Sequence, residues 1–141
     1  MWARRDLRLG ARPRGFHVIT EDVVSGMPEL GVVRVGMAHL LIAHTSASLT
    51  LNENASRAVL EDFRAWFDRA APEDAPYWTH RSEGPDDMPA HVKTALLDSS
   101  LSLPVADGCL VLGTWQGIYL CEHRDSGGPR RLVVTVWGED V

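Results

Sequence analysis

The pattern of apolar and polar positions predicts a chain that is mostly extended. Apolar residues alternate with polar ones, or form short runs bounded by glycine and proline, which is typical of strands. The predicted strands are residues 2–9, 16–19, 32–35, 37–51, 109–112, 118–122 and 132–137, with a further segment from Ser100 to a hairpin turn at Asp107-Gly108.

Helical spacing is clear in one segment and weaker in two others. Apolar residues three and four apart predict a helix from Ala55 to Ala70, capped by Asn52 or Asn54. The other predicted helices are a short one that Thr20 caps and that Gly26 and Pro28 limit, and one from Met88 to Leu97 that Asp87 caps, with Pro89 in its first turn. Residues 72–87 carry no periodicity, and a loop of this length is more often functional than filler.

The order of these elements predicts an α+β fold. We expect one domain over residues 1–141, in which an antiparallel β-sheet or sandwich packs with two or three helices. The segments after Ser100 are expected to form a β-meander.

Composition narrows the class of partner. The net charge of −5 argues against nucleic acid, and no apolar run approaches the roughly 20 residues that cross a bilayer. The N-terminus lacks the apolar core of a signal peptide, and the two cysteines are expected to be reduced, so the sequence predicts a cytoplasmic protein without a membrane partner.

A candidate site lies in the stretch from Leu40 to Asn54. His44 follows an apolar strand and precedes the hydroxyl side chains of Thr45, Ser46 and Ser48, an arrangement that delivers a base or ligand into a polar pocket. The alternative is a core strand with a structural histidine.

Two further histidines are candidates to join His44. His91 is predicted near a helix start, where the dipole favours neutral imidazole, and His123 ends a strand before a glycine turn. Three neutral imidazoles would suit Zn²⁺ with one position left open, although no short motif supports this. The alternative for His123 is a solvated strand end, and His80 in the long loop could close over a ligand.

A glycine turn precedes two arginines near the C-terminus. Backbone N–H groups of Ser126-Gly127-Gly128 and the guanidinium groups of Arg130 and Arg131 could bind a phosphate. A plain hairpin with solvated arginines is the alternative.

Four segments resemble the YjbQ-like family, which is also named the secondary thiamine-phosphate synthase family. They are HLLIAHTSASLTLNEN (39–54), EGPDDMPAHVK (83–93), LGTWQGIYLCEHRDSGG (112–128) and RRLVVTVWGE (130–139). The resemblance covers nearly the whole chain. It implies an α+β fold, a homotrimer with clefts between subunits, and a cluster of His44, His91 and His123 that holds a metal or an anion.

The resemblance also implies a reaction. A pyrimidine methyl diphosphate and a thiazole phosphate would be joined to give thiamine phosphate and pyrophosphate, a secondary activity of the family. A divalent metal, with Zn²⁺ favoured and Mg²⁺ possible, together with Arg124 and Arg130 would neutralise the diphosphate. Asp87 and Glu122 would orient the ligands or act with His44 in catalysis, and Thr45, Ser46 and Ser48 would bind phosphate oxygens.

Two alternatives remain open at the level of the sequence. One is a metal-dependent hydrolase or lyase that acts on another phosphorylated metabolite. The other is a protein that binds a metal or small molecule without turnover.

Overall fold

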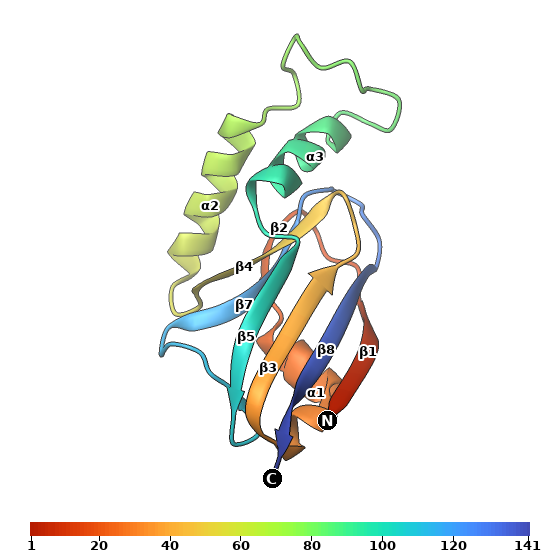
Figure 1. Ribbon diagram of the computed structural model, residues 1–141. Coiled ribbons are helices and arrows are strands. Elements are labelled where there is room, and N and C mark those ends of the chain that lie inside the picture. Colours follow the sequence, from red (N-terminus) through yellow and green to blue (C-terminus); the bar gives the residue numbers. More distant parts are fainter.

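The computed structural model describes residues 1–141 as two antiparallel sheets with three α-helices (Figure 1). The strands are β1 (Trp2–Leu9), β2 (Gly15–Val18), β3 (Val33–Ile42), β4 (Ala47–Glu53), β5 (Ser100–Ala106), β6 (Cys109–Leu110), β7 (Gln116–Glu122) and β8 (Arg130–Asp140). The helices are α1 (Thr20–Gly26), α2 (Arg57–Ala70), α3 (Asp87–Leu96) and the 3₁₀ turn η1 (Pro28–Val32). The predicted α+β class is confirmed.

The strands are distributed over two sheets in an order that is not sequential. One sheet has the order β1-β8-β3-β5-β6 and the other the order β2-β7-β4. The predicted meander is therefore wrong beyond the β5–β6 hairpin, because β7 leaves this sheet and pairs with β2 and β4. This crossing places the end of β7, with residues 122–124, beside the start of α3.

The predicted break at Gly36 does not occur, since β3 runs through this residue. A Cβ at Gly36 would lie 2.1 Å from the carbonyl oxygen of Trp137 on β8, so glycine allows two strands to approach closely. The chain bends later, over residues 43–46, before β4 begins. His44 consequently lies in a turn and not on the face of a strand.

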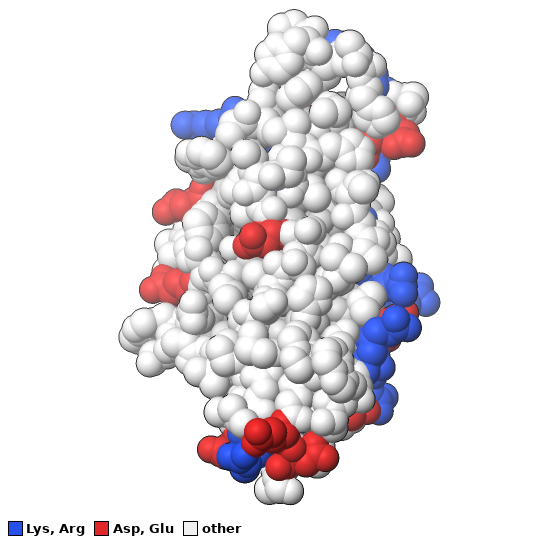
Figure 2. All heavy atoms as spheres, in the orientation of Figure 1, with Lys and Arg blue, Asp and Glu red and all other residues white.

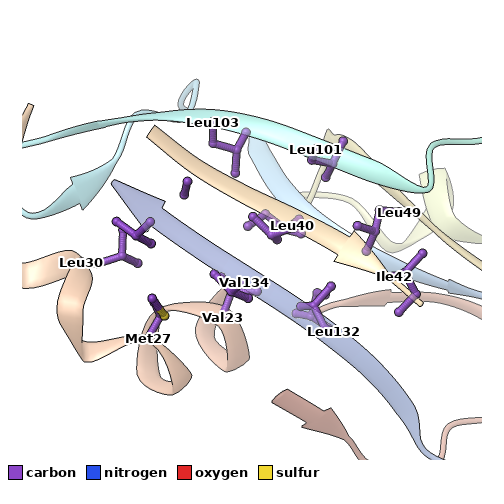
Figure 3. Close-up of a cluster of buried hydrophobic side chains, with 14 of the residues drawn as sticks. Val23, Met27, Leu30, Leu40, Ile42, Leu49, Leu101, Leu103, Leu132 and Val134 are labelled. Carbon is purple, nitrogen blue, oxygen red and sulfur yellow. The ribbon is translucent and has the colours of Figure 1, made fainter. Parts of the chain in front are cut away.

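The hydrophobic core fills the space between the two sheets. Leu40 of β3 and Val134 of β8 face Leu49 of β4, while Val23 of α1 and Met27, the residue after that helix, close one end (Figure 3). All five side chains are buried, and fully burying side chains of this size stabilises the fold by about 1.5–3 kcal/mol each.

None of the predicted caps is the residue that precedes its helix, since Ile19, Ser56 and Asp86 precede α1, α2 and α3. Helix α2 begins at Arg57, whereas Asn52, one of its two predicted caps, belongs to β4. Thr20 lies inside α1, and its hydroxyl accepts a hydrogen bond from the backbone N–H of Ile118. None of the helices has the length and apolar character that a membrane crossing requires.

Helix α2 covers the outer side of the smaller sheet. Phe16 of β2 packs against Phe63 and Phe67 of the helix, with ring centroids 5.4 and 5.6 Å away. Phe63 and Phe67 are half-buried by these contacts, but no residue of α2 belongs to the hydrophobic core between the sheets.

The outer face of the larger sheet carries few charges. Figure 2 shows this face over β5, β3 and β8 mostly free of Lys, Arg, Asp and Glu, with basic side chains gathered along the β1 edge. Trp2 is 75% exposed and stacks on Trp137 at 5.0 Å, and Leu41 is 39% exposed.

Candidate metal centre and anion pocket

Four side chains at the start of α3 bring potential metal ligands together. His80 and Glu83 come from the loop before the helix, and Asp87 and His91 lie one turn apart on α3. One ligand atom of each lies within 4.8 Å of the other three. Asp87 is buried, whereas the other three are partly or largely exposed. The cluster is thus closed on the protein side and open to solvent, as in sites that leave a coordination position free.

The hydrogen bonds of His91 prepare its Nε2 as a ligand. Its Nδ1 lies 2.9 Å from the carbonyl oxygen of Thr45, an acceptor only, so the proton of the ring is assigned to Nδ1. In neutral imidazole the lone pair of Nε2 then faces the Asp87 carboxylate at 3.1 Å. Two acceptors at this distance repel unless a proton or a cation lies between them, so the geometry fits a metal ion.

The imidazole of His80 contacts the same carboxylate oxygen of Asp87 as His91 does. Nε2 of His80 lies 2.6 Å from Oδ2 of Asp87 and 3.5 Å from Oε2 of Glu83. The hydrogen bond to Asp87 raises the pKa of His80. Burial opposes ionisation of Asp87, but hydrogen bonds and nearby positive charge hold the pKa of its carboxyl below the usual range. Asp87 is therefore anionic at neutral pH, as a metal ligand must be.

Arg124 fixes the segment that carries the ligands. Its guanidinium group donates to Asp86, to Oδ1 of Asp87 at 2.9 Å and to the carbonyl oxygen of Glu83 at 2.8 Å. Since these bonds use every nitrogen of the side chain, the predicted role of Arg124 as a phosphate ligand becomes one of positioning. Asp86 and Asp87 both accept hydrogen bonds from Arg124, and neither side chain caps α3.

A basic cavity of about 490 Å³ lies at the β1 edge. Three arginines and His44 supply its polar wall; its lining residues are Asp6, Leu7, Arg8, His44, Pro129, Arg130 and Arg131. Arg131 pairs with Asp6 at 2.7 Å, while Arg8 has no ion-pair partner. The cavity therefore offers uncompensated positive charge to an anion.

The cavity and the metal cluster are neighbours through two consecutive residues. His44 lines the cavity, and the carbonyl oxygen of Thr45 contacts His91. The turn of residues 43–46 therefore contacts both the cavity and the cluster.

Of the three histidines predicted to share a metal, only His91 belongs to the cluster. Nε2 of His44 already accepts the backbone N–H of Arg131 at 2.7 Å, so its lone pair is occupied. Burial and the charge of Arg130 lower the pKa of His44, so this ring is a neutral wall of the cavity. The ligand set is accordingly revised toward His80, Glu83, Asp87 and His91.

His123 is buried at a different place. Its Nε2 lies 2.7 Å from the hydroxyl of Ser48, and the ring borders a second cavity of about 240 Å³ that Arg14, Asp68 and Lys93 also line. Burial, with the positive charges of Lys93 and Arg130, lowers the pKa of His123 to about 3.

This low pKa predicts a marked acid sensitivity. The native state favours neutral His123, whereas the unfolded chain takes up a proton near the ordinary pKa of 6.5. The free energy of unfolding should therefore fall by about 1.4 kcal/mol per pH unit as the pH drops from about 6 to 4. In the His123→Asn variant, urea unfolding across this range should show a shallower slope. Equal slopes would contradict a neutral buried imidazole.

The remaining predicted site residues have mainly structural contacts. Ser48 is fully buried, and the carbonyl oxygen of Ser46 accepts from Arg130. Glu122 forms a buried, two-pronged pair with Arg130 at 2.8 and 2.5 Å. The other nitrogen of that guanidinium, Nη1, lies 3.4 Å from His44 on the cavity wall, and Glu122 orients no histidine.

Two ligands of the cluster were absent from the predicted metal site. His80 was expected only to cover a ligand, and Glu83 was not considered. The spacing His80-x₂-Glu83-x₃-Asp87-x₃-His91 carries the signal, because its last two members are one helical turn apart and project from the same side of α3.

The fold and this juxtaposition define an α+β protein with an imidazole–carboxylate cluster beside a guanidinium-lined cavity. Residues 5–139 match the family model described as UPF0047 protein YjbQ-like. The UPF0047 protein YjbQ of Salmonella typhimurium is 50% identical over 139 residues, which cover 99% of this chain and 100% of the relative. The chain therefore belongs to the YjbQ-like UPF0047 family.

Solved structures share the fold. A YbjQ-like protein of unknown function from Sulfolobus solfataricus superposes with a TM-score of 0.86 at 25% identity and covers 99% of each chain. An uncharacterised protein of the YjbQ/UPF0047 family from Clostridium acetobutylicum gives a TM-score of 0.80 at 35% identity, over 94% of this chain and 99% of that one.

Proposed function

We propose that this chain is a metal-dependent enzyme acting on a small phosphorylated metabolite. The first candidate reaction is the one that the family resemblance implies, in which a pyrimidine methyl diphosphate and a thiazole phosphate give thiamine phosphate and pyrophosphate. The observation that carries the proposal is the adjacency of the cluster around Asp87 to the cavity lined by Arg8 and Arg131.

The donor set fits a divalent ion. Two imidazoles and two carboxylates suit Zn²⁺ or Mn²⁺, and the carboxylates make Mg²⁺ more acceptable than a three-histidine set would. When bound, such an ion would neutralise negative charge on a departing diphosphate. Arg124 and the carbonyl of Thr45 hold Asp87 and His91 in place, so the protein supplies an ordered ligand set.

The cavity would bind the anionic end of the substrate. Arg8, which has no ion-pair partner, offers a guanidinium fork, which matches phosphate oxygens in two-pronged hydrogen bonds. His44 adds no charge when neutral, and its contact with the backbone of Arg131 holds that residue in position. The chain thus provides binding and charge neutralisation, which are the main requirements of diphosphate displacement.

Turnover of the two substrates tests the proposal. Wild-type protein loaded with Zn²⁺, Mn²⁺ or Mg²⁺ is expected to release pyrophosphate and form thiamine phosphate, and the Asp87→Asn variant is expected to do neither. Pyrophosphate or phosphate release from the diphosphate alone would favour the hydrolase or lyase. Stoichiometric metal without any turnover would contradict an enzyme of either kind and identify a binding protein.

The open face of the larger sheet supports assembly into the homotrimer that the resemblance implies. A face with few charges that exposes Leu41 and Trp2 is typical of a surface covered by another chain. Sedimentation equilibrium should give the mass of three chains for wild type and for Val24→Lys, a change on α1 outside this face, and one chain for Leu41→Lys. A single-chain mass for wild type would contradict the assembly.

The compartment is proposed to be the cytoplasm. Cys109 is exposed, Cys121 is buried, and both are free thiols, as expected where the surroundings are reducing.

A further inference from the structure

A third cavity shares His80 with the cluster of His80, Glu83, Asp87 and His91. It has a volume of about 230 Å³ and is walled by apolar and flat surfaces with two charges; its lining residues are Glu73, Trp78, His80, Arg81, Gly84, Pro85 and Met88. His80 belongs both to this wall and to the cluster. A molecule in the cavity would therefore lie next to the ligand atoms.

The indole of Trp78 is held in a fixed orientation. Its N–H donates to the carbonyl oxygen of Pro72 at 2.8 Å, and Tyr77 packs edge-on at 4.8 Å. Nε of Arg81 donates to the carbonyl oxygen of Trp78 at 2.7 Å and closes the loop on itself. A fixed aromatic surface loses little conformational freedom when a flat ring stacks on it.

The charged side chains of the cavity wall indicate which hydrogen-bonding groups the edge of a bound ring would carry. Neither Glu73 nor Arg81 has an ion-pair partner, so the carboxylate is free to accept a hydrogen bond and the guanidinium group to donate one. A heteroaromatic ring with an amino group next to a ring nitrogen offers the complementary donor and acceptor. A plain hydrocarbon ring would leave both charges unpaired.

We propose that the Trp78 cavity is the subsite for an amino-substituted nitrogen heteroaromatic ring of the substrate. The ring stacks on the indole with its amino group toward Glu73, next to His80. This assignment rests on the proposed function for the rest of the substrate, since the phosphorylated end would then reach toward the metal cluster. The Trp78 cavity would select the heteroaromatic ring of the substrate, whereas the cluster and the arginine-lined cavity would select its phosphorylated end.

The test compares variants by calorimetric titration with an aminopyrimidine methyl phosphate. Trp78→Leu should weaken binding about five- to 100-fold, the range for loss of one stacked base. Trp78→Phe also lacks the indole N–H but keeps an aromatic face, so it should stay within about fivefold of wild type. Trp66→Leu makes the same chemical change at an exposed position on α2 that does not line the cavity, so this variant should bind as wild type does.

Two further measurements separate this subsite from the metal proposal. Glu73→Gln should lose affinity for the aminopyrimidine but not for the same compound with hydrogen in place of the amino group. Metal content, measured on each variant, should be unchanged. If no protein holds metal, the proposed function fails while the difference between Trp78→Leu and Trp78→Phe still reports on stacking. Equal affinities of these two variants, or no binding by wild type, would overturn the subsite.

Discussion

Asp87→Asn is expected to abolish metal binding. The buried carboxylate is the only member of the cluster that contacts both imidazoles, through Oδ2 at 2.6 Å from His80 and 3.1 Å from His91. An amide is a neutral and much weaker ligand, and its nitrogen could face one of the rings. Because loss of an outer partner alone typically costs 10–100-fold in metal affinity, loss of this ligand should cost at least about 100-fold.

The measurement is zinc stoichiometry by elemental analysis after dialysis, with circular dichroism to confirm the fold. Asp140→Asn makes the same chemical change at an exposed position at the end of β8, and this variant should keep its zinc. His44→Ala should also retain it, since His44 lies outside the cluster. Zinc retained by Asp87→Asn and lost from His44→Ala would restore the three-histidine ligand set and refute the revised one.

The largest effect on stability is expected from Glu122→Gln. The side chains of Glu122 and Arg130 are 1% and 5% exposed, so the charge of the arginine would remain buried without its partner. Breaking a buried pair in this way costs about 3–5 kcal/mol of unfolding free energy. Glu122 also accepts the backbone N–H of Arg124, so the loss should extend to the segment that positions the candidate metal ligands.

Urea unfolding measures the cost of Glu122→Gln and compares it with the cost of breaking an exposed ion pair. Asp6→Asn breaks the exposed bridge to Arg131, which should be worth at most about 1 kcal/mol. The double variant Glu122→Leu/Arg130→Met removes both charges and should recover much of the lost stability. A cost below about 1 kcal/mol for Glu122→Gln would contradict the assignment of an uncompensated buried charge.

Local patterns in the sequence predicted the helices, strands and turns well, but they did not predict which strands pair with one another. The periodicity of residues 55–70 and the Asp107-Gly108 turn depend on neighbours in the chain, and both predictions are confirmed. The placement of β7 beside β4 depends on contacts between segments about 70 residues apart, which alternation cannot encode.

The site was predicted in part for the same reason. His91 and Asp87 were identified as candidates, because helix starts and polar clusters are visible locally. His44 was assigned to a strand face by extending the alternation past Ile42, where the chain in fact turns. The contact of Arg124 with Asp86 and Asp87 joins two elements across the fold, and no spacing rule links them.

The pairing of β1 with β8 has a consequence for biosynthesis. The first strand contacts only the last strand within its sheet, from Trp2↔Trp137 to Leu9↔Arg130. A nascent chain therefore carries an unpaired β1 until residues 130–137 have left the ribosome. The segment of residues 80–91 emerges before Arg124, whose hydrogen bonds to Asp86 and Asp87 hold it in place, so the cluster reaches its final geometry only after β7 has been synthesised.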